Sequence, residues 1–394
     1  MPTRLLTDTF VRFFESEKSG GLLLLFCTAI SLVLANSAVG AAYLAAWKTE
    51  WLGLSVEHWI NDGLMAIFFL MIGLELEREL YVGELSNLRN ALLPIFAAIG
   101  GMLAPALIHY AFNAGLPTQS GIGIPMATDI AFALGALALL GSRVPASLKV
   151  FVVAFAVIDD LGAIVMIALF YSSELSVAYL AGSLAVWLVL LLLNRVLRVS
   201  ALPVYLAGGV LMWVLMLKSG IHATIAGVML AFAIPFWSRS EDQPSPSHRL
   251  ENWLHKPIAL LVLPLFALAN TGVILNTDLL GELLGTNGLG IITGLVIGKP
   301  VGVVLLSLLA VSVGICRLPP DLRFPHLVGA GMLGGIGFTM SIFITNLAFG
   351  DDVMNIHASK IAIFCASLLA GVAGFAWLRM VAPAAPEAGD PAHS

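Results

Sequence analysis

The sequence predicts an all-α polytopic membrane protein with about twelve transmembrane helices, and three observations lead to this fold class. Apolar residues make up 59% of the chain, whereas only 11% are charged, against roughly 25% in a soluble domain. The apolar residues gather in runs of spanning length, and the basic residues are distributed very unevenly between the connecting loops. A soluble fold has too little interior to bury so much apolar surface, so most of this chain must be solvated by lipid.

The apolar runs give the predicted spans in order, since a spanning helix needs about 20 mostly apolar residues. They lie near residues 20–38, 59–80, 91–112, 121–140, 148–172, 177–196, 202–217, 220–237, 257–275, 287–314, 327–349 and 358–381. Residues 1–381 are therefore expected to form a single transmembrane domain. Residues 382–394 are rich in Pro and Ala and predict a disordered cytoplasmic tail.

The basic residues orient these spans when the loops are assigned alternately to the two sides of the membrane. One side holds fifteen Lys and Arg residues: Arg4, Arg12, Lys18, Arg78, Arg89, Arg143, Lys149, Arg195, Arg198, Arg239, Arg249, Lys256, Arg317, Arg323 and Arg379. The other side holds only Lys48, Lys218 and Lys360, while Lys299 falls inside a span. Basic loops stay in the cytoplasm, so both termini are predicted to be cytoplasmic.

The sequence only partly predicts the structure of two segments between the spans. Residues 42–58 alternate bulky and polar side chains around three tryptophans, which fits either an external hairpin or an interfacial aromatic belt. Residues 238–256 form the longest polar stretch on the basic side, and the piece Pro244-Ser245-Pro246-Ser247 is typical of a flexible loop.

Four ionisable residues lie near the centres of predicted spans: Asp129, Asp159, Asp160 and Lys299. A charge at that depth costs roughly 2.5–3.5 kcal/mol and usually marks an ion pathway. A purely structural ion-pair network is the alternative, but three acids against one base leave two negative charges unbalanced. Neighbouring residues on a helix point about 100° apart, so one of Asp159 and Asp160 can face a pathway while the other meets Lys299. The pattern does not decide which.

Two of the spans look interrupted. The fourth contains Gly121, Gly123 and Pro125 just before Ala127-Thr128-Asp129, and the eleventh contains four glycines between Gly331 and Gly337. Broken helices at matching positions of two halves are typical of secondary transporters, whose half-helix ends face the substrate site. Asp129 and Lys299 have suitable charges to balance the positive and negative ends of such half-helices.

Two other functional classes must be weighed against a transporter. A passive cation channel would need a ring of acids or a filter of carbonyl groups. An intramembrane aspartate-dependent enzyme would also use two aspartates, but on different helices rather than adjacent in one. The three cysteines, Cys27, Cys316 and Cys365, lack metal-ligand spacing. We therefore expect no cofactor, no enzymatic activity and no nucleic-acid partner.

Several sequence strings resemble the NhaA-type bacterial sodium/proton antiporters, in order along nearly the whole chain. They are residues 68–75 (FFLMIGLE), 127–132 (ATDIAF), 157–162 (VIDDLG), 217–224 (LKSGIHAT), 298–300 (GKP) and 335–341 (GIGFTMS). The resemblance implies secondary active exchange of Na⁺ or Li⁺ for H⁺ across the bacterial inner membrane, electrogenic and regulated by pH. It also implies that spans three to five and ten to twelve are inverted repeats that form the transport core, with spans four and eleven crossing.

The resemblance also implies roles for individual residues. Asp160 is the principal carboxylate for cation and proton, and Asp159 is its partner. Thr128 and Asp129 belong to the crossed-helix assembly, and Lys299 pairs with the acids.

A pH-sensing group is implied as well, formed by Glu75, Arg78, Glu79, Glu251 and His222. The spacing of the first three is also that of ordinary salt bridges at a helix end. A histidine such as His222 is also commonly just hydrogen-bonded. Glu77 departs from the family pattern, in which we expect a basic residue.

The family further implies membrane lipids as partners and a homodimer linked through an external hairpin near residues 42–58. The arginine pair that we associate with a lipid at the dimer seam is replaced here by Ser200 and Ala201.

Overall fold

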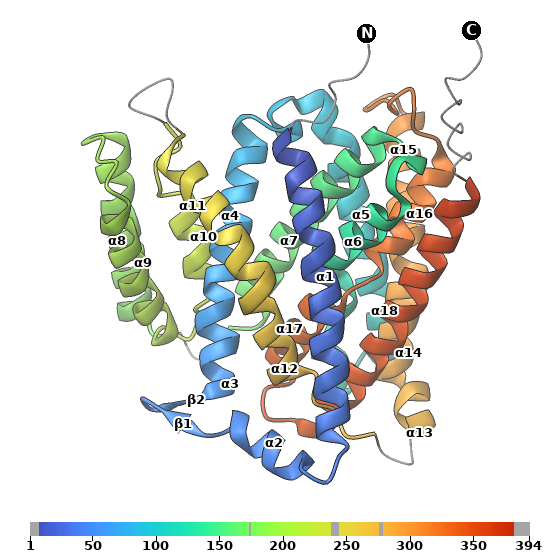
Figure 1. Ribbon diagram of the computed structural model, residues 1–394, viewed down its shortest axis with the longest axis horizontal. Coiled ribbons are helices and arrows are strands. Elements are labelled where there is room, and N and C mark those ends of the chain that lie inside the picture. The colour runs from blue at the N-terminus through green and yellow to red at the C-terminus, as the bar shows by residue number, and fades with distance from the viewer. Residues whose placement is uncertain (1–7, 173–174, 238–243, 276–278, 382–394) are drawn as a thin grey trace, which may run out of the picture.

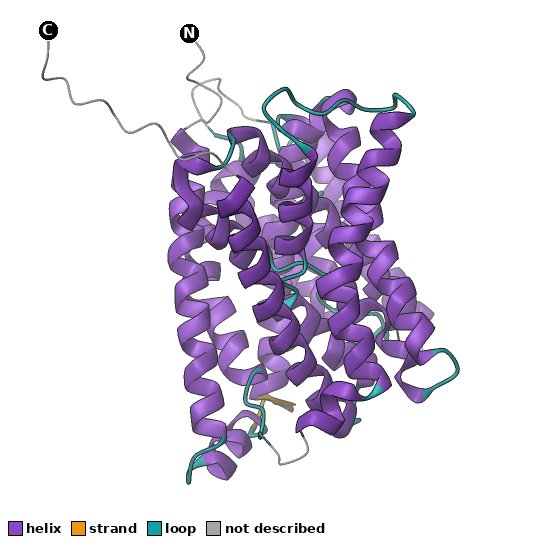
Figure 2. Ribbon diagram, turned by 90° about the vertical axis from the view of Figure 1, so that its right-hand side faces the viewer, coloured by secondary structure: helices purple, strands orange, loops and turns teal. Residues whose placement is uncertain are grey.

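The computed structural model describes residues 8–172, 175–237, 244–275 and 279–381. These residues form a bundle of helices that run along a common direction, as Figures 1 and 2 show. The α-helices are α1 (Asp8–Ala35), α2 (Gly40–Trp47), α3 (Val56–His58), α4 (Met65–Tyr81), α5 (Leu88–Asn113), α6 (Ile130–Leu140), α7 (Ala146–Phe170), α8 (Val177–Arg195), α9 (Leu202–Leu217), α10 (Ile225–Ala231), α11 (Pro246–Pro257), α12 (Leu263–Asn270), α13 (Leu279–Leu284), α14 (Thr286–Thr293), α15 (Lys299–Ser312), α16 (Phe324–Gly334), α17 (Phe338–Phe349) and α18 (Val353–Val381).

Several helices continue through turns of a different pitch. The π-helical segments are η1 (Trp59–Leu64), η5 (Ile258–Val262) and η6 (Gly294–Gly298), and the 3₁₀ segments are η2 (Glu84–Ser86), η3 (Pro117–Met126) and η4 (Gly141–Arg143). Such segments relax the regular hydrogen-bond ladder of a helix, often at functional sites. Two of them are close in the chain to charged residues that the sequence predicts inside the membrane, since η3 ends three residues before Asp129 and η6 ends directly before Lys299.

The predicted all-α polytopic membrane fold is confirmed. Within the described residues, eight helices are long and apolar enough to cross a membrane, and two bent pairs raise the number to ten if each pair is one span. The eight are Val56–Tyr81, Leu88–Asn113, Pro117–Leu140, Ala146–Phe170, Val177–Arg195, Pro246–Asn270, Thr286–Ser312 and Val353–Val381. The bent pairs are Gly20–Ala35 with α2, and α16 with α17. The number of twelve spans stays a prediction.

The predicted span at 220–237 is the one that differs most from the structure. Only Ile225–Ala231 forms a helix there, α10, and it is preceded by turns from Ser219 to Thr224. Gly220 has a positive φ of 84°, a backbone conformation that glycine adopts readily. The apolar run is long enough for a span, but the turn after α9 uses up its first residues.

The segment around residues 42–58 is partly a hairpin, as one of the two interpretations expected. Strands β1 (Glu50–Trp51) and β2 (Leu54–Ser55) pair antiparallel, and Leu52 and Gly53 turn the chain with positive φ. Residues 40–47, however, form helix α2, which bends 119° away from α1. The hairpin therefore covers residues 50–55 and is shorter than predicted.

The polar stretch 238–256 is helical over much of its length. Residues 238–243 lie outside the described part of the chain, but α11 begins at Pro246 and is capped by the Ser245 hydroxyl, which accepts from the amide of His248 at 3.2 Å. The predicted tail 382–394 also lies outside the described residues.

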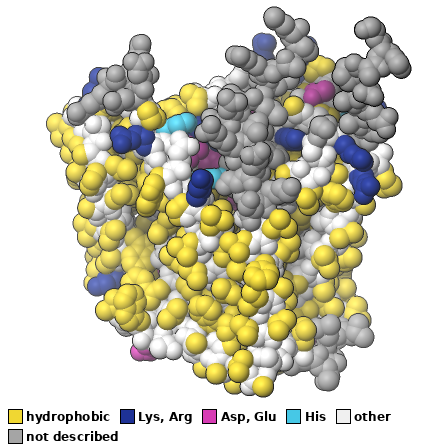
Figure 3. All heavy atoms as spheres, in the orientation of Figure 1, with side chains coloured by type: hydrophobic (Ala, Val, Ile, Leu, Met, Phe, Trp, Pro, Cys, Tyr) yellow, Lys and Arg dark blue, Asp and Glu magenta, His cyan; other side chains and the backbone are white. Residues whose placement is uncertain are grey.

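The molecule has two distinct ends. Helix α1 begins and α18 ends at one of them, which we name the terminal end, and the hairpin 50–55 lies at the other, the hairpin end (Figure 1). Apolar side chains cover the flank between them, and most Lys and Arg side chains visible in Figure 3 gather at the terminal end. This arrangement agrees with the uneven distribution of basic residues in the sequence.

The helices that surround the buried acids pack together through close contacts between their backbones. Gly100 of α5 and Gly302 of α15 face each other, so that a Cβ atom on either would overlap the carbonyl oxygen of the other. Helix α16 approaches α15 as closely, because a Cβ on Gly331 would lie 2.7 Å from the Cα of Pro300. Small residues at such crossings let helices approach in a membrane.

Candidate functional site

The two interrupted helices meet at their interruptions. The first consists of η3, the extended residues Ala127, Thr128 and Asp129, and then α6; the second consists of α16, a break at residues 335–337, and then α17, bent by 48°. The Thr128 hydroxyl donates to the carbonyl of Gly334 at 2.8 Å, and the amide of Asp129 donates to the carbonyl of Ile336 at 2.6 Å. Donors in the first interruption therefore satisfy two backbone carbonyls at the second.

Asp129 lies at the amino ends of two helices. Its carboxylate accepts from the amide of Phe132 at 3.3 Å and so caps α6. It also accepts from the amide of Thr339 at 3.1 Å and from the Thr339 hydroxyl, at the start of α17. A helix amino terminus carries a partial positive charge of about half a unit, so two such ends balance one carboxylate.

Lys299 is paired with Asp159. Its ammonium group lies 2.8 and 2.9 Å from the two carboxylate oxygens of Asp159, and both side chains are fully buried. The same ammonium donates to the carbonyl of Met126, the last residue of η3. The lysine thus lies at the negative end of one half-helix, as its sign suggested, and the acid that it meets is Asp159.

Asp160 lies one residue further along α7 and has a different environment. It is 2% exposed, and its Oδ1 atom has no hydrogen-bond partner. It lines a small cavity together with Asp129, Thr339, Met340, Phe68 and His255. The helical angle between adjacent residues therefore separates an acid that is ion-paired from one that faces a cavity.

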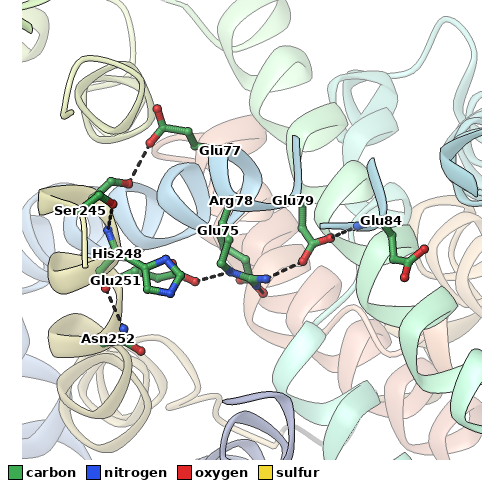
Figure 4. A network of polar contacts seen from close by, with 10 residues as sticks. Glu75, Glu77, Arg78, Glu79, Glu84, Ser245, His248, Glu251 and Asn252 are labelled. Atoms are coloured by element: carbon green, nitrogen blue, oxygen red, sulfur yellow. Dashed lines mark hydrogen bonds and ion pairs between the residues drawn. The ribbon is translucent and has the colours of Figure 1, made fainter. Parts of the chain in front are cut away.

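A second charged cluster lies near the terminal end and is shown in Figure 4. Arg78 of α4 contacts three carboxylates: Glu79 at 2.8 Å, Glu251 of α11 at 2.8 Å and Glu75 at 3.7 Å. His248 lies 3.8 Å from Glu251. Four of the five residues that the resemblance assigns to pH sensing are therefore in contact, and they join α4 to α11.

Glu77, the departure from the family pattern, does not contact Arg78. Its carboxylate is 3% exposed and accepts from the Ser247 hydroxyl at 2.9 Å. Figure 4 shows it apart from the Arg78 group. Glu77 thus adds a second link between α4 and α11.

His222 is not brought into this cluster. Its Nδ1 atom lies 3.4 Å from Asp62 and its ring meets the edge of Phe343. Asp62 also contacts His58, at 2.6 Å, near the amino end of the same helical span. His222 therefore belongs to a separate group on the hairpin side of the bundle.

Sequence reasoning did not single out Thr339 as a site residue. Its amide and hydroxyl both reach Asp129, and it lines the cavity next to Asp160. The signal was present, because Thr339 is the second residue after the glycine break, where a half-helix presents its free amides.

Comparisons with known proteins show the family to which the chain belongs. Residues 11–378 match the family described as Na+/H+ antiporter 1. The chain is 65% identical over 373 residues to the Na(+)/H(+) antiporter NhaA of Dechloromonas aromatica (strain RCB), covering 95% of this chain and 96% of that protein. It is 58% identical over 376 residues to the Na(+)/H(+) antiporter NhaA 1 of Flavobacterium johnsoniae (95% and 98%), and 48% identical over 381 residues to the Na(+)/H(+) antiporter NhaA of Vibrio cholerae serotype O1 (96% and 99%). Since the family match includes both interrupted helices, the buried acids and the Arg78 cluster, the chain belongs to the Na+/H+ antiporter 1 family.

Proposed function

We propose that this Na⁺/H⁺ antiporter performs its exchange at Asp160, which holds either a proton or a sodium ion. Membership in an antiporter family points to a transporter rather than to the passive channel or the aspartate-dependent enzyme. The observation that carries the assignment to Asp160 is its buried Oδ1 atom, which lacks a hydrogen-bond partner and faces a cavity.

The compensation of the buried charges supports the assignment of ion exchange to Asp160. Asp159 is balanced by Lys299, and Asp129 by the amino ends of α6 and α17. Asp160 alone among the three acids has no such compensation. An uncompensated buried carboxylate is costly by several kcal/mol, so it must take up one monovalent cation, either H⁺ or Na⁺.

Competition for this one carboxylate produces exchange. Sodium prefers oxygen ligands, as hard cations do, and the cavity that Asp160 lines is also lined by the oxygen-bearing side chains of Asp129 and Thr339. Lithium shares this preference, so we propose it as a second substrate. If the site reaches one side of the membrane at a time, each sodium ion that binds displaces a proton, and no nucleotide hydrolysis is required.

We propose further that the exchange is electrogenic. Sodium binding can draw Asp159 away from Lys299, and the pair then releases a second proton. Each net charge moved would couple to the membrane potential with about 2.3 kcal/mol per 100 mV. A dependence of the exchange rate on an imposed potential, without a pH gradient, tests this stoichiometry.

The remaining assignments extend the same proposal. Spans three to five and ten to twelve form the transport core within residues 1–381, and Glu75, Arg78, Glu79 and Glu251 regulate its response to pH. His222 is proposed as a separate regulatory residue on the hairpin side. The protein lies in the bacterial inner membrane with cytoplasmic termini, surrounded by lipids, and forms a homodimer through the hairpin at residues 50–55, where Trp51 is 63% exposed.

The central test replaces Asp160 in proteoliposomes with an imposed pH gradient. Asp160→Asn keeps the size of the side chain but cannot exchange a proton, so sodium-driven proton movement should be abolished. Asp352→Asn, at an exposed acid before α18, is the matched control and should exchange normally. Near-normal exchange by a folded Asp160→Asn protein would overturn the assignment.

A further inference from the structure

A groove lies between α1, α6 and α18 on the flank of the bundle, and Figure 1 shows α1 and α18 on either side of α6 there. Its volume is about 540 Å³, and among the described residues that line it only Thr28 and Ser367 have polar side chains. The Thr28 hydroxyl donates to the carbonyl of Leu24 at 2.8 Å. The Ser367 hydroxyl accepts from the amide of Phe338 at 3.2 Å. Both hydroxyls thus bond within the protein, and the groove suits an apolar occupant.

Three glycines, one from each helix, leave the groove open. A Cβ atom on Gly135 of α6 would meet no atom within 4 Å beyond its own turn of helix. A Cβ on Gly21 of α1 or on Gly371 of α18 would lie 3.5 or 3.4 Å from its nearest neighbour, which is an ordinary van der Waals contact. Gly100 and Gly302, by contrast, have no room for a side chain. The three groove glycines are therefore not required for helix packing, and a large side chain on one of them would occupy the groove.

The groove extends through about one leaflet of a bilayer. Its lining runs from Phe364 to Ala376 on α18, which is about 18 Å at 1.5 Å per residue. The hydrocarbon core of a bilayer is about 30 Å thick, so one leaflet provides about 15 Å. At the inner end, the ring of Phe338 lies 5.0 Å from that of Phe132 and 5.6 Å from that of Phe364. These rings end the groove beside the break at residues 335–337, and the groove runs from there toward the terminal end, where α18 ends.

Two arginines follow the groove at the terminal end. Arg379 lies four residues after Phe375 and three after Ala376, so it continues the face of α18 that lines the groove. Arg143, the last residue of η4, lies four residues after Leu139 of α6, which also lines the groove. Both arginines are exposed, and within the described part of the chain neither has an ion-pair partner.

We infer that this groove binds one acyl chain of an anionic phospholipid from the leaflet at the terminal end, with Arg143 and Arg379 at the lipid phosphate. An acyl chain matches the groove in length and in its lack of polar groups. A guanidinium donates two parallel hydrogen bonds to a phosphate, which favours a phospholipid over other apolar occupants. A negatively charged headgroup is attracted further by basic residues at the membrane surface.

This site is separate from the lipid that the family resemblance places at the dimer seam. Ser200 and Ala201, which replace the arginine pair expected there, directly precede α9, and α9 lies across the bundle from α18 in Figure 1. The groove is instead lined by Ile336, whose carbonyl accepts from the amide of Asp129, and by Phe338, the first residue of α17. A lipid bound here therefore packs against the crossed helices rather than against the hairpin.

Binding of phosphatidylglycerol to the full-length, delipidated protein in detergent tests the headgroup contact. Native mass spectrometry across a lipid titration gives the affinity, and phosphatidylcholine with the same acyl chains is the lipid control. Arg143→Gln and Arg379→Gln should each weaken phosphatidylglycerol binding about fivefold, equivalent to about 1 kcal/mol, and leave phosphatidylcholine binding unchanged. Arg89→Gln, at an exposed arginine in α5, is the matched control and should bind as the parent does. Arginine variants that bind phosphatidylglycerol as tightly as Arg89→Gln, or that lose both lipids equally, would overturn the inference.

A second pair of variants tests the groove itself. Gly135→Phe places a ring in the open space and should reduce phosphatidylglycerol binding at least about tenfold. Gly182→Phe is its control, because Gly182 of α8 lies outside the groove and its Cβ would also meet only a side chain, that of Leu215 at 3.5 Å. Gly371→Leu fills the same groove from α18 and must give the same loss if Gly135→Phe fails to fold. Equal binding by the filled and control variants would contradict the inference. Because binding is measured without transport, this result is independent of that of Asp160→Asn.

Discussion

At the scale of the residue, the main finding is that two adjacent aspartates have different partners. Asp159 is held by Lys299, whereas Asp160 lines a cavity and leaves one oxygen without a hydrogen bond. The helical angle of about 100° between neighbours accounts for this division. One acid can therefore stabilise the fold while the next remains available to a cation.

The ion pair between Lys299 and Asp159 should contribute strongly to stability. Lys299→Ala leaves a buried carboxylate without its partner, which we expect to cost about 3 kcal/mol and to lower the melting temperature in detergent. The loss should be smaller at acidic pH, because a protonated Asp159 carries no charge to be compensated, and larger as the pH rises. Thermal unfolding measured across a pH series checks both statements.

The double variant Lys299→Ala/Asp159→Ala supplies the control for this prediction. Removal of both partners leaves no unpaired charge, so the double variant should melt at a higher temperature than the sum of the two single losses implies. Strictly additive losses would contradict the pairing as a source of stability.

The sequence was most informative about residues with an electrostatic reason for their position. Asp129 and Lys299 were matched in sign to the ends of half-helices, and each is found at an end of the expected sign. The choice between Asp159 and Asp160 could not be made from the residues alone, because it depends on where α15 lies around α7. The hydrogen bonds that join the side chains of Asn61, Asn270 and Asn346 connect residues far apart in sequence, and no local pattern indicates them.

At the scale of the element, the glycines of α5 and α15 set the distance between the helices that surround the site. Gly100 and Gly302 bring the two backbones into direct contact. Lys299 lies at the start of α15, so the position of its ammonium group depends on this crossing.

Replacing one of these glycines with a larger residue should therefore lower the stability of the protein. In Gly302→Ala the new methyl group would overlap the Gly100 carbonyl, and we expect a loss of about 1–3 kcal/mol in stability. Gly135→Ala is the matched control, since no atom lies within 4 Å of the corresponding Cβ in α6. Thermal unfolding should separate the two, and an equal melting temperature for both would contradict the close-packing argument.

Elements were predicted well where the chain carries an explicit signal. Glycines and a proline indicated both interrupted helices, and the structure breaks them at residues 127–129 and 335–337. The α11 start was missed because Ser245-Pro246 was interpreted as loop composition, although a serine cap followed by proline is also a helix start. The predicted span at 220–237 was wrong in extent, because hydropathy cannot show where a turn interrupts an apolar run.

At the scale of the whole molecule, the charged cluster and the cavity are connected by continuous helical elements. The Arg78 cluster ties α4 to α11 near the terminal end, and the same span that contains α11 continues into η5 and α12, which reach the cavity. We propose that a change in the cluster is transmitted along α4 and α11 to the cavity. This continuity supports a regulatory rather than a transporting role for the cluster.

Removal of one carboxylate from the cluster should displace the pH dependence of exchange without erasing it. Glu75, Glu79 and Glu251 surround one guanidinium, so removing one negative charge changes the electrostatic potential at the remaining groups, and Glu75→Gln or Glu79→Gln should move the profile by about one pH unit. Rates in proteoliposomes at a series of pH values measure the displacement, with Asp352→Asn, the exposed acid before α18, as the control that should leave the curve in place. An unmoved curve would favour an ordinary structural salt bridge, whereas loss of activity at every pH would place these acids in the transport step. Glu77 accepts a hydrogen bond from Ser247 at a position where the resemblance implies a basic residue, so we also expect this chain to become active at a different pH from a relative with a basic residue there.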